Sequence, residues 1–276
     1  MSPDFRVAAI PVGPAGPDPE PLWREVDAGI ARAAAAGAVL AVLPELTVLP
    51  YVAGADPARW RHLAEPADGP TAARMGGLAR RHGLAVLFGL ALAEDADRLP
   101  LNAAMLAQSD GSLIGLAAKR HLPPPLPGER FGEADHFRAG PAGIRAVRVG
   151  PVRVAALVCY DRRFAGAWDE AAAAADLVAV LVAGPAPQDP PGFFAAELTG
   201  HARRCRVPAL AAARYGIEHG LGRPVRHDGD SLVVGPDGRV LAASGPLAAS
   251  RALAPRPALA ALSPPDPVRP PLPTTA

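Results

Sequence analysis

Three reactive side chains each follow an apolar run whose length and composition are typical of a β-strand. Glu45 comes after "VLAVLP", Lys119 after "SLIGLAA" and Cys159 after "RVAALV". Sites in open α/β sheets are built at the C-terminal ends of strands, so these three groups could converge on one pocket. Taken singly they have plainer interpretations. A lone cysteine after an apolar run is more often a buried structural thiol, and an isolated charge in a loop is more often solvated.

Together the three residues could carry out nucleophilic catalysis. A free thiol has a pKa of about 8.5 and is mostly protonated at neutral pH, so a catalytic cysteine needs a base or a local positive field. Glu45 could supply the base. The Lys119 ammonium could supply the field and stabilise the oxyanion that forms when a carbonyl or nitrile carbon is attacked. Histidine is the usual alternative base, and His121 is the nearest candidate, although its spacing does not mark it as the partner of Cys159.

The elements that must position these residues alternate strands with helices, with hairpins in between. The periodicity predicts strands at 5–13, 39–44, 84–92, 150–159, 176–183 and 207–216, helices at 19–38, 71–83, 164–175 and 193–206, and hairpins at 101–119 and 231–244. Such βαβ units mixed with hairpins favour helices packed on a mixed sheet or on a pair of sheets.

Composition indicates an ordinary globular protein. The 276 residues fit one large domain or two, half of them are hydrophobic, and 28 basic against 27 acidic residues give a net charge of +1. The arginines are scattered, which disfavours a nucleic-acid partner. Two cysteines are too few for a disulfide framework, the start lacks signal-peptide features, and the apolar runs are shorter than the roughly 20 residues of a membrane helix. We expect a soluble, cytoplasmic protein without a membrane partner.

Two segments fall outside the alternation of strands and helices. Residues 120–140, "RHLPPPLPGERFGEADHFRAG", form a long Pro-rich stretch without period, which suggests a functional loop and, as a hypothesis, a lid over the substrate. From Pro255 the chain is low in complexity and again rich in proline, so it is predicted to be extended or mobile rather than packed. We therefore predict one domain over residues 1–254 and a tail over 255–276.

The segments "AVLPEL", "AAKRHL" and "ALVCYDRRF" resemble, in order and spacing, the three signature segments of the carbon-nitrogen hydrolases, the nitrilase superfamily. The resemblance runs from about Phe5 to Ser244. It implies an α/β fold of the α-β-β-α sandwich type, in which two mixed sheets are flanked by helices. It also implies a homodimer or a higher homo-oligomer.

Carried over residue by residue, the resemblance implies that Cys159 is the nucleophile, Glu45 the general base and Lys119 the oxyanion-stabilising cation. Glu133 matches an additional glutamate that orients the lysine and the base, and the backbone N–H of Tyr160 would join Lys119 in the oxyanion hole. The implied reaction is attack on a C–N carbonyl carbon, loss of ammonia or an amine, and hydrolysis of a thioester. The implied chemistry needs no metal or organic cofactor.

The residues after the cysteine indicate a branch of the family. Tyr160-Asp161 is similar to the amide-hydrolysing branches, because nitrilases typically have Trp-Glu there. Arg162-Arg163 resembles the N-carbamoyl-amino-acid amidohydrolases, whose arginines at these positions hold the substrate carboxylate. The alternative is that one or both arginines form salt bridges with Asp161 or with the long loop.

Other features keep further alternatives open. The family often has an Asn-Pro-Ser-like segment at the pocket where this chain has "AGPAP" (183–187), and Ala213 stands where asparagine is usual. These changes affect the pocket and leave the three catalytic positions intact, so nitrile hydrolysis and a catalytically silent binding or assembly protein remain alternatives. Cys205 is interpreted as a structural thiol. The segment 219–230 is interpreted as a polar loop, because it lacks the spacing of a zinc site.

Overall fold

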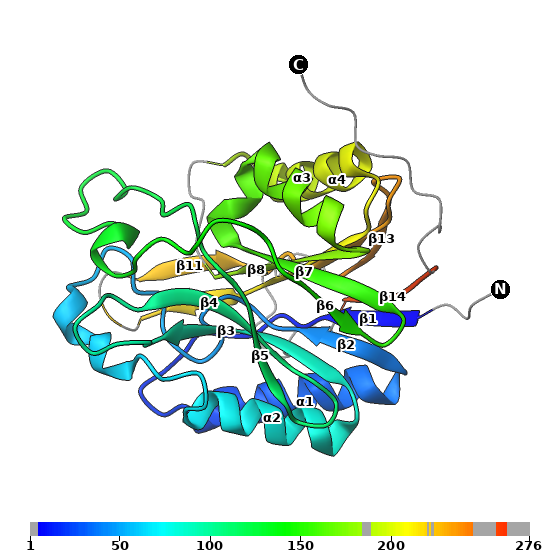
Figure 1. The fold of residues 1–276 in the computed structure, drawn as a ribbon. Helices are drawn as coiled ribbons and strands as arrows, with labels where there is room; N and C mark the ends of the chain where they lie inside the picture. The colour runs from blue at the N-terminus through cyan, green and yellow to red at the C-terminus, as the bar shows by residue number, and fades with distance from the viewer. Residues whose placement is uncertain (1–4, 184–188, 220, 222–223, 245–257, 264–276) are drawn as a thin grey trace.

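The computed structural model describes residues 5–183, 189–219, 221, 224–244 and 258–263. Within them two six-stranded sheets pack face to face, and a pair of helices covers the outer face of each sheet (Figure 1). The first sheet has the strand order β14-β1-β2-β3-β4-β5 and the second has the order β13-β12-β9-β8-β7-β6. The predicted α-β-β-α sandwich is confirmed.

The helices that cover the first sheet are α1 (Glu20–Ala35) and α2 (Pro70–His82), and those on the second are α3 (Ala165–Ala174) and α4 (Phe193–Cys205). The strands are β1 (Phe5–Ala9), β2 (Ala38–Val42), β3 (Ala85–Leu92), β4 (Leu101–Ala107), β5 (Leu113–Ala118), β6 (Ala146–Val149), β7 (Val152–Val158), β8 (Leu177–Val182), β9 (Ala209–Ala213), β10 (Tyr215–Glu218), β11 (Val225–Asp228), β12 (Leu232–Val234), β13 (Val240–Ala243) and β14 (Ala258–Leu262).

The two halves of the sandwich share one topology. In the first half, β1, β2 and β3 are parallel and are joined through α1 and α2, and β4 and β5 follow as antiparallel strands. In the second half, β7, β8 and β9 are parallel and are joined through α3 and α4, and β12 and β13 follow as antiparallel strands. Parallel neighbours need crossover connections, which is why each half has its two helices on one face.

Burial follows the hydrophobic pattern of the sequence. The stripe of Leu22, Val26 and Ile30 on α1 packs into a cluster with the outer face of the first sheet. Strands β3 and β8 are buried along their whole length, as expected for continuously apolar strands covered on both faces. A second, larger cluster joins the inner faces of both sheets, so a single core holds the ends of the central strands in place.

The structure corrects two predictions. Residues 258–262 are packed rather than mobile: they form β14, which pairs antiparallel with β1 over Phe5–Ala9 and extends the first sheet. The segment 219–230 is not wholly a polar loop, because Val225–Asp228 pairs with Tyr215–Glu218 as a two-stranded ribbon. Both strands are short and gain their pairing partner only in the folded protein, so local composition does not reveal them.

The long segment 120–140 is mostly irregular and contains one short 3₁₀ helix, η3 (Glu133–Asp135). The other 3₁₀ helices of the described residues are η1 (Pro57–Arg59), η2 (Arg61–Leu63) and η4 (Cys159–Arg163), and η4 directly follows β7. None of the helices in the described ranges combines the length and the apolar character needed to cross a membrane.

Candidate active site

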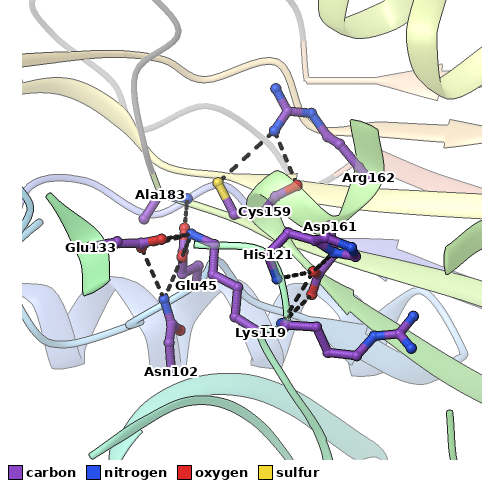
Figure 2. A network of polar contacts seen from close by, with 10 residues as sticks. Glu45, Asn102, Lys119, His121, Glu133, Cys159, Asp161, Arg162 and Ala183 are labelled. Atoms are coloured by element: carbon purple, nitrogen blue, oxygen red, sulfur yellow. Dashed lines mark hydrogen bonds and ion pairs between the residues drawn. The ribbon is translucent and has the colours of Figure 1, made fainter. Parts of the chain in front are cut away.

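The strand ends bring the predicted residues together. Lys119 directly follows β5, Cys159 directly follows β7, and Glu45 lies three residues beyond the end of β2. Figure 2 shows the Glu45, Lys119 and Glu133 side chains gathered on one side of the Cys159 thiol. The Lys119 Nζ lies 2.9 Å from Glu45 Oε1 and 2.6 Å from the Glu133 carboxylate. Residues that are far apart in sequence therefore form one buried cluster.

The backbone around Glu45 is held in an unusual conformation. Leu46 has a φ of 46°, in the left-handed region that non-glycine residues rarely adopt. Gly89 of β3 passes so close that a Cβ there would lie 2.2 Å from the Leu46 backbone nitrogen. Thr47 fastens the turn, since its backbone N–H donates to the Gly89 carbonyl and its hydroxyl accepts from the Gly89 N–H, each over 3.0 Å. The close approach to β3 fixes where the Glu45 side chain begins.

Three donors surround the Glu45 carboxylate. Besides Lys119, the Asn102 side-chain amide donates to Oε1 over 2.6 Å, and the Ala183 backbone N–H donates to Oε2 over 2.9 Å. Asn102 lies in β4, and its amide is also 3.4 Å from Glu133. The pocket segment that starts at Ala183 therefore contributes a backbone group to this cluster, and residues 184–188 lie outside the described residues.

Glu133 is anchored by the short helix η3. His136 is the residue after η3, and its ring accepts a hydrogen bond from Trp60 Nε1 over 2.7 Å. Both rings are fully buried. The His136 and Phe137 N–H groups donate to the Glu133 carbonyl. The segment 120–140 thus delivers its glutamate from a packed stretch.

The charges of the cluster depend on one another. Burial alone would raise the pKa of Glu45, but the charge of Lys119 and the three hydrogen bonds hold that pKa below its ordinary value. Burial opposes the charge on Lys119, yet the two neighbouring carboxylates raise the pKa of the lysine well above its ordinary value. Burial, together with the Glu45 charge, raises the pKa of Glu133 to about 7 against the opposing effect of Lys119. At neutral pH the cluster therefore contains a charged lysine and an ionised Glu45.

Cys159 occupies a second strained position. Its φ is 47°, again in the left-handed region, and such residues typically cost about 1–3 kcal/mol and cluster at functional sites. The Arg162 Nη1 donates to the Cys159 carbonyl over 3.1 Å and lies 3.9 Å from Sγ. Burial, and then the charge of Glu45, raise the pKa of the Cys159 thiol to about 11. The resting thiol is therefore protonated and faces an ionised carboxylate.

Asp161 ties the cysteine segment to the lysine segment. Its carboxylate accepts hydrogen bonds from the backbone N–H groups of Arg120 and His121, the two residues after Lys119. The His121 ring nitrogen Nδ1 also lies 2.7 Å from Asp161 Oδ1, and the ring stacks on Phe164 with centroids 3.6 Å apart. His121 is thus engaged away from the thiol, and the histidine alternative for the base receives no support.

The two arginines after the cysteine have acidic partners. Arg162 Nε lies 2.8 Å from Glu197 of α4, and Arg163 Nη2 lies 2.5 Å from Asp189. The arginines do form salt bridges, as the alternative expects, but their partners are Glu197 and Asp189 and not Asp161 or the long loop. The sequence did not indicate Glu197 or Asp189 as partners, since both lie more than 25 residues further along the chain.

Sequence reasoning gave no role to two further residues beside the cluster. Asn102 is a fully buried polar residue within an otherwise apolar strand, and that contrast was an available signal. Tyr51 lies close enough that burial, and then the charge of Glu133, raise the pKa of its hydroxyl well above the ordinary value. Nothing in the local sequence distinguishes Tyr51 from an ordinary loop tyrosine. Within the described residues, no group of three or more His, Cys, Asp or Glu side chains could hold a metal ion.

Comparison with known proteins places this geometry among known enzymes. The family model described as carbon-nitrogen hydrolase matches residues 6–251. The chain is 32% identical over 214 residues to the "hydrolase in pqqF 5'region" of Pseudomonas protegens, which covers 76% of this chain and 69% of that protein. It is 29% identical over 226 residues to the N-carbamoylputrescine amidase of Solanum lycopersicum, which covers 76% and 72% of the two chains.

Solved structures of an amidase from Nesterenkonia sp. AN1 share the fold. One is a variant with the acetamide moiety of fluoroacetamide added covalently at the active-site cysteine. It superposes with a TM-score of 0.75 at 26% identity over 94% of this chain and 90% of that one. Another, with the same TM-score, identity and coverage, contains butyramide.

Proposed function

Because the chain belongs to the carbon-nitrogen hydrolase family, we propose that it hydrolyses a small amide or N-carbamoyl compound through a thioester on Cys159. The resemblance seen in the three sequence segments is confirmed, and the chain is an enzyme of the class that acts on C–N bonds other than peptide bonds. The observation that carries the proposed thioester mechanism is the arrangement at Cys159, where a protonated thiol faces an ionised Glu45 and a charged Lys119.

The first half of the reaction forms the thioester. Glu45 takes the proton of the Cys159 thiol as Sγ attacks the substrate carbonyl carbon. The Lys119 ammonium and the Tyr160 backbone N–H stabilise the oxyanion of the tetrahedral intermediate. When the intermediate collapses, the C–N bond breaks, the proton on Glu45 passes to the leaving nitrogen, and ammonia or an amine departs.

The second half regenerates the enzyme. Glu45 takes a proton from a water molecule that attacks the thioester carbon, and the same oxyanion donors act again. Collapse breaks the C–S bond, releases the acid, and returns the proton from Glu45 to Sγ. Glu133 holds Lys119 in place throughout, because its carboxylate lies 2.6 Å from Nζ.

The substrate class rests on the relatives and on the arginines. Two kinds of similar protein act on small C–N compounds by name: the plant N-carbamoylputrescine amidases and the Nesterenkonia amidase. We further propose that Arg162 and Arg163 recognise a substrate carboxylate, as the resemblance implies. Arg163 is the more accessible of the two, with a quarter of its side chain exposed, so an acidic substrate would compete there with Asp189.

Ammonia release from a panel of simple amides, ω-amides, N-carbamoyl amino acids and nitriles tests the proposal. We expect wild-type protein to release ammonia from an amide or N-carbamoyl member and Cys159→Ala to release none. Cys205→Ala, which removes the buried thiol of α4, is the matched control and should retain activity. Release only from nitriles would move the protein to the nitrilase branch. No release from any member, together with equally slow iodoacetamide labelling of both cysteines, would support the catalytically silent alternative.

Two properties of the whole molecule stay proposals. We propose a homodimer or higher homo-oligomer, which light scattering coupled to gel filtration measures directly, and a cytoplasmic location, which fractionation of the source cells measures.

The proposed domain over residues 1–254 excludes β14, so a truncation after residue 254 removes a strand that pairs with β1 along five residues. Its melting temperature should fall below that of the full chain.

A further inference from the structure

A fully buried arginine, Arg214, contacts the loop that follows Glu45. Arg214 directly follows β9, and none of its side chain is exposed. Its backbone N–H donates to the Val182 carbonyl at the end of β8, and the next residue, Tyr215, donates to the Val12 carbonyl beyond β1. Arg214 therefore lies where the ends of strands from both sheets run side by side.

The Arg214 guanidinium binds the loop that follows the general base. Its Nη2 donates to the Leu46 carbonyl over 2.7 Å and to the Leu49 carbonyl over 2.9 Å. Leu46 is the residue after Glu45 and has the left-handed backbone described above. Both carbonyls bind one nitrogen of the guanidinium, which leaves Nη1 for a second partner in the same rigid plane, whereas a lysine has one nitrogen for all of its partners.

A buried acid completes the arrangement. Arg214 Nη1 lies 3.0 Å from Glu218 Oε2, and the Glu218 carboxylate also accepts from the backbone N–H groups of Ala15 and Tyr51. Together, Arg214 and Glu218 contact backbone groups of Leu46, Leu49 and Tyr51. The loop that begins at the general base and ends at Tyr51 is therefore fastened at both ends by one buried ion pair.

Stability alone is a weak explanation for this pair. Taking both charges out of water is costly, and well-packed apolar side chains of similar volume are often as stabilising as a buried ion pair. What apolar side chains cannot supply is directional binding of the two carbonyls and the two N–H groups. The contacts therefore favour a role in geometry.

We infer that Arg214, held by Glu218, is a positioning residue that keeps Glu45 and Tyr51 in place beside Cys159. The inference rests on the proposed amide hydrolysis, because it assigns Arg214 a part in the action of its general base. Arg214 acts through the backbone of residues 46–51 and touches no reacting atom. A misplacement of about 1 Å in a catalytic group can cost roughly 100-fold in rate.

The test compares Arg214→Lys with a core variant of similar stability. Lysine keeps the charge and loses the fork, so we expect kcat for an amide that wild type hydrolyses to fall by roughly 100-fold, while KM changes by less than about threefold. Ile30→Ala truncates a fully buried side chain of α1, far from the loop, and should lower the melting temperature while keeping kcat. A merely structural role predicts that both variants keep the wild-type kcat per folded molecule.

Glu218→Gln is the second variant, for the case in which Arg214→Lys does not fold. Glutamine keeps the volume and an oxygen acceptor but removes the charge that holds Arg214, so kcat should again fall with little change in KM. Wild-type kcat in a folded Arg214→Lys or Glu218→Gln variant would overturn the inference. A wild-type protein that releases no ammonia would instead overturn the proposed function, so the two failures are distinguishable.

Discussion

The two sides of Cys159 are built in different ways. On one side the polar groups are almost completely buried, come from strand ends or from a packed turn, and bind one another: Glu45, Asn102, Lys119 and Glu133. On the other side two ion pairs join the cysteine turn to segments further along the chain: Arg162 with Glu197 and Arg163 with Asp189. Figure 2 shows Arg162 across the thiol from Glu45.

This difference in burial suggests a division of roles: the buried side carries out the reaction, and the side with the arginines selects the substrate. Groups attached to the ends of buried strands cannot move without disturbing the core, so the proposed proton acceptor Glu45 and the proposed oxyanion cation Lys119 are held before substrate arrives. The outer pair of Arg163 and Asp189 is partly exposed, where solvent screens charges and each ion pair contributes little to stability. Substitutions on the buried side, around Glu45 and Lys119, should therefore abolish turnover. Substitutions on the arginine side should alter which substrate is used.

The largest expected effect comes from removing the proposed proton acceptor. Glu45→Gln keeps the shape and the oxygen acceptor but cannot accept a proton, so kcat should fall by roughly 10²- to 10⁴-fold. Glu197→Gln is the matched change on the other side of the thiol and should cost far less. Steady-state ammonia release measures both, and equal losses would contradict the division between the two sides.

A smaller loss should follow from crowding the base. Gly89→Ala places a Cβ 2.2 Å from the Leu46 nitrogen, so the turn after Glu45 must shift, and activity should fall by roughly 100-fold with a lower melting temperature. Gly77→Ala is the control, because a Cβ on that α2 residue meets nothing within 4 Å and should stabilise the helix by about 0.5–1 kcal/mol. Unchanged activity in Gly89→Ala would mean that the base tolerates displacement.

The buried side should also show itself in the pH dependence of stability. The pKa of Glu133 is about 7 in the folded protein, above its ordinary value of 4.5, so its contribution to stability is fully present below pH 4.5. That contribution is lost as the pH rises through about 7. Between these values the melting temperature of wild type should fall relative to that of Glu133→Gln, which cannot ionise. Parallel curves for the two proteins, followed by calorimetry, would contradict the raised pKa.

The smallest effect is expected at Arg163, in the partly exposed ion pair with Asp189. Arg163→Ala should raise KM for acidic amides by roughly tenfold, the loss of one charged hydrogen bond, and leave KM for neutral amides unchanged. The comparison needs one acidic and one neutral amide of similar size. If both KM values stay at the wild-type level, Arg163 has no part in carboxylate recognition.

Much of this site could be predicted because its signals are local. Glu45, Lys119 and Cys159 each follow an apolar run, and the burial of β3 and β8 follows directly from their continuous hydrophobicity. The pairing of the arginines could not be predicted. Arg162 is adjacent to Asp161 in sequence but pairs with Glu197, which α4 brings alongside η4.

By itself the sequence determined the order of the helices and central strands and the residue types at the strand ends, because periodicity and adjacency act over a few residues. Only the tertiary structure decided which charges meet and which backbone is strained. Arg214 binds the Leu46 carbonyl across 168 residues, and β14 pairs with β1 across 249 to 257 residues. Such contacts exist only in the folded protein, because folding brings segments that are distant in sequence within hydrogen-bonding distance.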